Sequence, residues 1–148
     1  MLALHKTVFE IESAGFQLRI KVAFHMIKKI LIVDDSPISR KMLRSCVPKD
    51  RGYEFFEAGD GLAGLEMYKE IRPDVTFMDL TMPVMDGASA TDEIKKFDPQ
   101  ATVIVCTADI QVKSISHVLG LGALMVVKKP PTKETIEDAL SKAEEQIG

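Results

Sequence analysis

Three acidic residues occupy positions in this 148-residue sequence where they could do chemistry. The pair Asp34-Asp35 follows the apolar run "ILIV", and Asp79 follows the apolar run "VTFM". An acid inside a buried strand is costly to desolvate, whereas an acid at the open end of a strand is not. Because ligands of open α/β sheets bind at the carboxyl ends of the strands, we expect these three carboxylates to lie close together.

Thr107 and Lys129 follow two further apolar runs, "TVIVC" and "LMVV". A lysine supplies a point charge for a phosphoryl group, and a threonine hydroxyl can donate a hydrogen bond to a phosphoryl oxygen. Three neighbouring acids repel one another, and Mg²⁺, which prefers oxygen ligands, would relieve that repulsion. An aspartate carboxylate can itself act as a nucleophile. We therefore expect Asp79 to become an aspartyl phosphate beside a Mg²⁺ ion.

The apolar runs alternate with segments of helical period from Lys29 onward. Expected strands cover residues 30–33, 53–58, 75–78, 102–106 and 124–127. Expected helices start at Ser36-Pro37 and at Asp60, span 88–97 and 110–119, and run from about 132 to the C-terminus. Continuously apolar strands are typical of a sheet covered on both faces. The alternation predicts an α/β fold, a doubly wound five-stranded parallel sheet with helices on both faces.

Two details of this pattern can be checked against a structure. In the first expected helix, Ile38, Met42 and Cys46 are spaced at four-residue intervals, which predicts that they form its buried face. Cys46 and Cys106 make no metal-ligand pattern, and we expect both to be plain core residues.

Residues 1–25 do not fit the alternation, so the domain is expected to span 26–148. Strict alternation of apolar and polar residues over 16–24 predicts a half-buried strand. Three interpretations stay open for this segment: a non-native start, a strand added to a sheet edge, or a disordered tail.

The overall composition excludes several classes of protein. The net charge of −3 gives no electrostatic basis for binding nucleic acid. No apolar run approaches the roughly 20 residues of a membrane span, and no secretory signal is visible. We expect a cytoplasmic protein with no nucleic-acid or membrane partner.

The chemistry-bearing segments together resemble a known family. The segments "ILIVDDS", "VTFMDLTMPVMDG", "CTAD", the Gly122-Ala123 pair and "KKP" occur in an order and at a spacing similar to the receiver domains of two-component response regulators, of the single-domain chemotaxis type. The resemblance implies the flavodoxin-like strand order 2-1-3-4-5.

The resemblance also implies roles for individual residues. Asp79 would be the phosphoacceptor, and Asp35 and Asp79 would bind Mg²⁺ directly. The backbone carbonyl of Thr81 would be a third protein ligand, with Asp34 acting largely through water. Thr107 and Lys129 would contact the phosphoryl group, and the Lys129-Pro130 peptide bond would be cis.

The implied partners are a histidine kinase or phosphotransfer protein and a downstream target protein. The target would bind the face of the fourth helix, fifth strand and fifth helix, which covers 110–119, Val126 and 132–140. Val126 stands where the family often has an aromatic residue, and Pro131 follows Pro130 where an apolar side chain is common. With Val126 at that position, coupling to the face would run through other residues, and Pro131 stiffens the entry to the last helix.

Two alternative functions remain to be weighed. A Mg²⁺-dependent aspartyl-phosphate phosphatase usually needs a second acid two residues after its nucleophile, and that residue is Thr81. An unphosphorylated interaction module would not need the intact acids and lysine. We expect a signalling protein that catalyses only its own phosphorylation and dephosphorylation.

Overall fold

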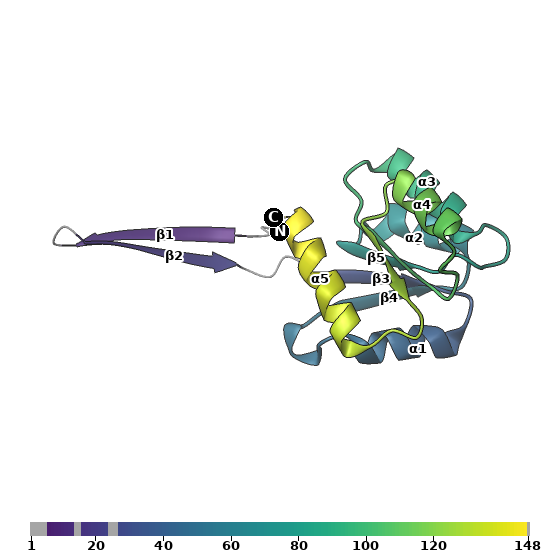
Figure 1. Ribbon diagram of the computed structural model, residues 1–148, viewed down its shortest axis with the longest axis horizontal. Helices are drawn as coiled ribbons and strands as arrows, with labels where there is room; N and C mark the ends of the chain where they lie inside the picture. The colour runs from purple at the N-terminus through teal and green to yellow at the C-terminus, as the bar shows by residue number, and fades with distance from the viewer. Residues whose placement is uncertain (1–5, 14–15, 24–26, 148) are drawn as a thin grey trace.

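The computed structural model of the protein describes residues 6–13, 16–23 and 27–147. Five parallel strands form one sheet in the order β4-β3-β5-β6-β7 (Figure 1). They are β3 (Lys29–Val33), β4 (Glu54–Ala58), β5 (Val75–Met78), β6 (Val103–Thr107) and β7 (Met125–Lys128). Counted from β3, this is the expected order 2-1-3-4-5, so the fold prediction is confirmed.

Five α-helices connect and follow these strands. They are α1 (Pro37–Cys46), α2 (Gly61–Ile71), α3 (Gly87–Phe97), α4 (Val112–Gly120) and α5 (Lys133–Ile147). A short 3₁₀ turn, η1 (Lys49–Arg51), lies between α1 and β4. The first three helices begin after side-chain caps: Ser36, Asp60 and Asp86 each accept a backbone N–H from the third residue that follows.

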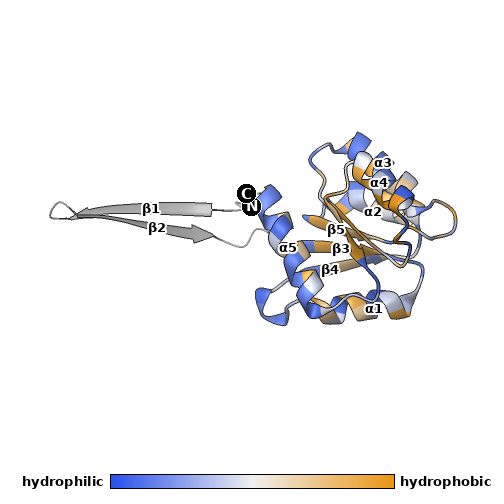
Figure 2. Ribbon diagram, in the orientation of Figure 1, coloured by the Kyte–Doolittle hydropathy of each residue, from blue (hydrophilic) through white to orange (hydrophobic). Residues whose placement is uncertain are grey.

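Helices cover both faces of the sheet, as Figure 1 shows. Ile30 and Ile32 of β3 pack in one core cluster with residues of α1 and α5, and Leu31 and Val33 pack in a second cluster with residues of α2 and α3. Val118 of α4 belongs to a third, smaller cluster. In Figure 2 the central strands β3 and β5 are mainly hydrophobic, whereas α1 and α5 carry both hydrophobic and hydrophilic residues.

The buried face of α1 differs from the expected one. Ile38 is 75% exposed and Met42 is 43% exposed, so that prediction was wrong for both. Leu43 is the buried residue of this helix, and Cys46 is half-buried against the core. The side-chain cap at Ser36 and the proline at the first helical position fix where the helix begins. Its phase is set by packing against the sheet, where Leu43 and not Met42 joins the core. Cys106, in contrast, is buried as expected.

The segment before the domain contains two strands of its own. β1 (Lys6–Ser13) and β2 (Phe16–Ala23) pair antiparallel, with Phe9 opposite Ile20, and form a separate two-stranded sheet (Figure 1). The strand expected over 16–24 is therefore present, but its partner is β1 and not an edge of the five-stranded sheet. The domain boundary at residue 26 stays a prediction.

Within the described ranges, none of the helices has the length and apolar character that crossing a membrane requires.

Candidate functional site

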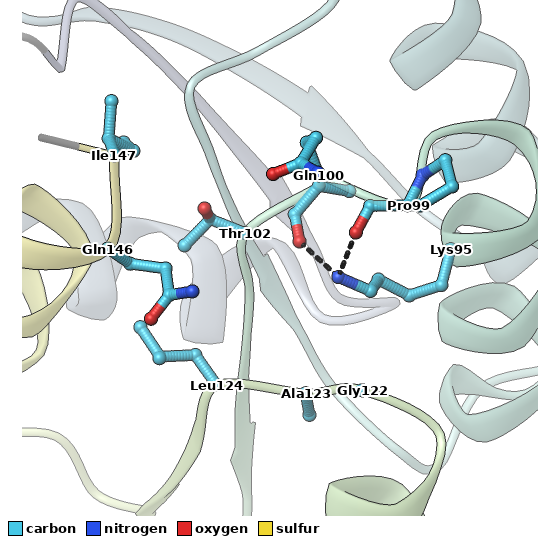
Figure 3. A pocket seen from close by; sticks show the side chains of 10 residues that line it. Lys95, Pro99, Gln100, Thr102, Gly122, Ala123, Leu124, Gln146 and Ile147 are labelled. Carbon is cyan, nitrogen blue, oxygen red and sulfur yellow. Dashed lines mark hydrogen bonds between the residues drawn. The ribbon is translucent and has the colours of Figure 1, made fainter.

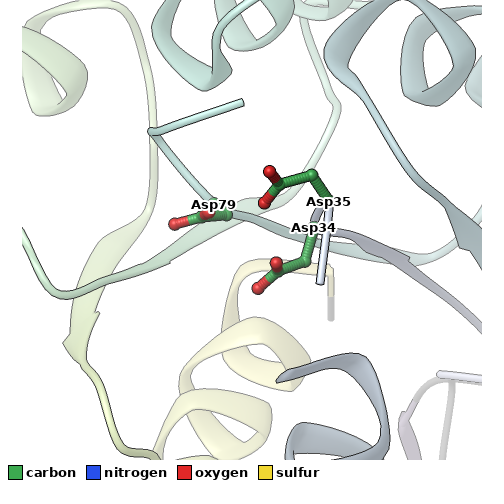
Figure 4. Close-up of side chains that lie close together, drawn as sticks. All are labelled: Asp34, Asp35 and Asp79. Atoms are coloured by element: carbon green, nitrogen blue, oxygen red, sulfur yellow. The ribbon is translucent and has the colours of Figure 1, made fainter. Parts of the chain in front are cut away.

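Three carboxylates meet at the edge of the sheet where the parallel strands end. One carboxylate oxygen from each of Asp34, Asp35 and Asp79 lies within 4.8 Å of the others (Figure 4). Asp34 and Asp79 are only 5% and 7% exposed, and Asp35 is open to solvent. The expectation that the three acids converge is confirmed. A cluster made only of oxygen donors fits a hard divalent cation such as Mg²⁺.

The sheet itself places these acids. The Asp34 N–H donates to the Ala58 carbonyl (3.1 Å), and the Asp79 N–H donates to the Val33 carbonyl (2.9 Å). Both acids thus take the next position of the strand ladder, one residue beyond the last apolar residue. The Ser36 N–H donates to Asp34 Oδ1 (2.9 Å), which bends the chain toward α1.

Lys129 lies between two of the acids. Its Nζ donates to Asp34 Oδ2 at 2.6 Å and lies 3.5 Å from Asp79 Oδ1. The peptide bond from Lys129 to Pro130 is cis, as the family resemblance implied. The neighbouring Lys128 is exposed. Lys129 is therefore the lysine that faces the acids, in line with the sequence-based expectation.

The electrostatics of the cluster are set by burial and by these charges. Burial raises the pKa of Asp79, and the Asp34 charge adds to this, while the Lys129 charge opposes it. Burial works to lower the pKa of Lys129, but its hydrogen bond to Asp34 and the two acidic charges outweigh burial and raise that pKa. The two acids therefore favour the charged form of Lys129, and a nearby positive charge favours the ionised form of Asp79.

Thr107 ends β6 as a buried residue, and a hydrogen-bond chain leads from it to α4. Its Oγ1 accepts the Asp109 N–H (3.1 Å). The Asp109 carboxylate in turn accepts the Ser114 hydroxyl of α4 (2.7 Å) and the Gln111 N–H (3.2 Å). A movement of Thr107 would therefore disturb a contact to the fourth helix. Val126, the residue at the usual aromatic position, is half-buried in the third core cluster and packs near Val105 and Val118.

The loop between β5 and α3 is held by two close backbone approaches. A Cβ at Gly87 would overlap the carbonyl of Asp79, and a Cβ at Gly61 would overlap the carbonyl of Met85. The Gly61 N–H also donates to that Met85 carbonyl (3.0 Å). Thr81 is an exposed residue of this loop, and its role as a metal ligand stays a prediction.

Arg40, which the sequence did not single out, touches the site, and Glu57 holds it there. Arg40 of α1 donates from Nη1 to the Asp34 carbonyl (2.6 Å) and from Nε to Glu57 of β4 (2.7 Å). The only signal in the sequence was a basic residue six positions after Asp34. It was weak because Arg40 binds a main-chain carbonyl, which any residue type provides.

Two hollows differ in their relation to the cluster. One of about 290 Å³ lies beside it, between α1 and the β7–α5 loop, with Asp34, Met42 and Lys129 among its lining residues. A larger one, about 390 Å³, includes the C-terminal end of α5 and the segment just before β6 in its lining (Figure 3). There, Lys95 Nζ donates to the carbonyls of Pro99 and Ala101, both at 2.8 Å, so the ammonium group already binds the main chain of the domain. The smaller hollow, and not the larger, adjoins the acids.

Comparison with known proteins agrees with this arrangement. The family model for the response regulator receiver domain matches residues 30–141. The chemotaxis protein CheY of Thermotoga maritima is 41% identical over 116 residues, which cover 78% of this chain and 96% of that protein. Sporulation initiation phosphotransferase F of Bacillus subtilis is 37% identical and is matched over 94% of its length, with 79% of this chain covered.

Solved structures show the same fold. CheY in a CheX-CheY-BeF3-Mg complex from Borrelia burgdorferi superposes with a TM-score of 0.72 at 29% identity, covering 76% of this chain and 86% of that one. CheY4 of Vibrio cholerae gives 0.72 at 28% identity, covering 79% and 98%. With the strand order and the family match in agreement, the chain belongs to the response regulator receiver domain family of two-component signalling systems.

Proposed function

We propose that this protein is a phosphorylation switch in which Asp79 accepts a phosphoryl group from a histidine kinase or phosphotransfer protein, with Mg²⁺ as cofactor. The observation that carries the proposal is the cluster itself: three carboxylates within 4.8 Å of one another, with Lys129 bonded to Asp34 and close to Asp79. The Borrelia burgdorferi structure, a receiver-fold CheY bound to BeF3, Mg²⁺ and CheX, supports it by analogy.

Each residue of the cluster has a part in the transfer. An Asp79 carboxylate oxygen forms the new P–O bond, and the bond from phosphorus to the donor nitrogen or oxygen breaks, with its electron pair leaving on the donor. Lys129 exchanges its contact with Asp34 for one with a phosphoryl oxygen. Thr107 turns its hydroxyl proton toward another phosphoryl oxygen.

Asp34, Asp35, Asp79 and the Thr81 carbonyl would hold Mg²⁺, which supplies positive charge to the phosphoryl oxygens and to the acids. The donor set is compatible because every side chain of the cluster offers oxygen. A bound metal would also relieve the repulsion that disfavours ionised Asp79.

The output surface is the face made by α4, β7 and α5. Drawing Thr107 toward a phosphoryl group would weaken its bond to the Asp109 N–H, and Asp109 is bonded to Ser114 of α4. We propose that this chain transmits the change to a target protein in the cytoplasm. It offers a route that does not need the aromatic residue which Val126 replaces.

The test is the intact mass of the protein after incubation with acetyl phosphate, with and without Mg²⁺. We expect one added phosphoryl group that requires Mg²⁺ and is lost in Asp79→Asn. Asp86→Asn is the matched control, because Asp86 lies in the same loop and caps α3, and asparagine caps a helix about as well as aspartate. A protein that gains no mass would instead be an unphosphorylated interaction module.

A further inference from the structure

Arg40 of α1 forms a charged hydrogen bond with the main chain of the acidic cluster. Its Nη1 donates to the carbonyl oxygen of Asp34 at 2.6 Å, and its Nε donates to Glu57 Oε1 at 2.7 Å. The Arg40 side chain is only 18% exposed. A guanidinium holds two acceptors in a fixed geometry, and hydrogen bonds from a charged donor are the stronger kind.

The bond to the Asp34 carbonyl completes the hydrogen bonding of this residue. The Asp34 N–H is bonded to Ala58, and the Asp34 carboxylate is bonded to the Ser36 N–H and to Lys129. The carbonyl of Asp34 belongs to the same planar peptide unit as the nitrogen of Asp35. Arg40 therefore fixes the plane from which Asp35 projects, and Asp35 is the exposed acid of the cluster.

Glu57 keeps the guanidinium in place. It lies on β4, the neighbour of β3 in the sheet, and accepts from Arg40 with one oxygen and from Arg44 at 3.3 Å with the other. Through Arg40 of α1, the Glu57 side chain on β4 is thus linked to the main-chain carbonyl of Asp34 at the end of β3. Arg44 shares Glu57, but its hydrogen bond goes to that acid and not to Asp34.

We propose that Arg40 is a positioning residue for the divalent-cation site: by bonding the Asp34 carbonyl it orients the Asp34-Asp35 peptide so that the Asp35 carboxylate stays with those of Asp34 and Asp79. This inference rests on the proposed function, since it concerns the Mg²⁺ site. Groups that orient metal ligands from outside typically change metal affinity by about 10–100-fold when they are removed.

The experiment is calorimetric titration of the full-length protein with Mg²⁺ alone. We expect Arg40→Met to raise the Kd about tenfold. Arg40→Lys should raise it by a similar factor, because lysine keeps the charge but cannot bond Asp34 and Glu57 with a rigid fork. Arg44→Met removes the second bond to Glu57 and should leave the Kd within twofold of the wild-type value.

A second readout separates orientation from a general loss of stability. Urea unfolding without metal should give similar losses for Arg40→Met and Arg44→Met, while the amide resonances of Asp35 and Ser36 shift in the Arg40 variants alone. A Kd unchanged in Arg40→Met, raised equally in Arg44→Met, or restored by Arg40→Lys would overturn the inference. A wild-type protein that binds no Mg²⁺ would instead remove the proposed function, and the role of Arg40 with it.

Discussion

At the scale of single residues, Asp79 is buried, yet the proposed phosphoryl transfer would require its ionised form. Burial raises the pKa of this carboxyl, and Asp34 adds to the effect. A group whose pKa is higher in the folded state favours folding fully when protonated, and that contribution is lost as pH rises through the folded-state pKa. Ionised Asp79 therefore opposes folding of the metal-free protein at neutral pH.

Asp79→Asn should accordingly stabilise the protein at pH 7 without Mg²⁺, by about 0.5–2 kcal/mol, the range common for stabilising single substitutions. The gain should shrink as pH falls below the unfolded-state pKa, because wild-type Asp79 is then neutral as well. Urea unfolding at pH 7 and at pH 3 measures both values.

The same substitution at the other end of β5 should act in the opposite sense. The Asp74 carboxylate accepts the N–H groups of Lys28 and Lys29, both at 2.9 Å. Asp74→Asn should therefore cost about 1–2 kcal/mol at pH 7. If Asp79→Asn and Asp74→Asn changed the free energy of unfolding equally, burial would not be the cause of the raised pKa of Asp79.

Residue types and spacing were enough to bring Asp34, Asp35, Asp79 and Lys129 to one site, because strand ends in a parallel sheet share an edge. They were not enough for Arg40 and Glu57. These two reach the site through a main-chain carbonyl and a cross-strand ion pair, and neither contact has a side-chain motif in the sequence.

At the scale of elements, the β5–α3 loop contains a strained residue. Val84 has φ of 67° and is 78% exposed. A β-branched residue rarely adopts this left-handed conformation, which costs of order 1–3 kcal/mol, whereas asparagine tolerates it. The strain lies five residues after Asp79, in the loop that would supply the Thr81 carbonyl.

Val84→Asn should therefore raise the free energy of unfolding by about 1 kcal/mol. Val112→Asn is a matched control, since Val112 is 79% exposed and is not among the residues with positive φ. It should stay within about 0.5 kcal/mol of wild type. Thermal or urea unfolding distinguishes the two, and similar shifts would argue against strain at Val84.

A buried hydroxyl in β5 offers another test. Thr76 is fully buried, and its Oγ1 has no hydrogen-bond partner among the described residues. Thr76→Val should stabilise the domain by about 1 kcal/mol, because it replaces an unpaired polar group with a methyl group. Thr76→Ser keeps the hydroxyl and loses a methyl group, so it should destabilise; a gain in both variants would exclude this explanation.

Local sequence was enough to predict where some helices begin. It was not enough to predict the start of α4 or which face of α1 is buried. The expected start at Ser36-Pro37 matches α1, which begins at Pro37, and the start expected at Asp60 lies one residue before α2, which Asp60 caps. α4 was expected from 110 and begins at Val112, because the Asp109 carboxylate accepts the Gln111 N–H and holds a turn before the helix. The apolar spacing in α1 could not show that Ile38 and Met42 stay exposed, since the phase depends on packing against the sheet.

At the scale of the whole molecule, the proposed function predicts that Mg²⁺ stabilises the fold, because it would bind the folded cluster and has little reason to bind the unfolded chain. The gain should be about 1.4 kcal/mol at a Mg²⁺ concentration ten times Kd. It should fade as pH falls through the titration of the carboxylates. Thermal unfolding at matched ionic strength measures this, and Asp35→Asn should lose most of it; an equal rise in that variant would exclude the shared site.

Deleting residues 1–25 should leave the domain intact, because β1 and β2 form a sheet of their own. We expect the melting temperature of residues 26–148 to stay within about 2 °C of the full chain, a change that corresponds to well under 1 kcal/mol. Phosphoryl incorporation should be equal in both. A truncated protein that does not fold would move the domain boundary toward the N-terminus.

The hydrogen-bond chain from Thr107 through Asp109 to Ser114 has a consequence that runs in the reverse direction. Coupling between two sites is reciprocal: whatever factor the phosphoryl group adds to affinity at α4, a protein bound at α4 must add to the equilibrium for phosphorylation at Asp79. A tenfold gain in one is a tenfold gain in the other. The concentration of the target protein in the cell would then help to set the fraction of this protein that is phosphorylated.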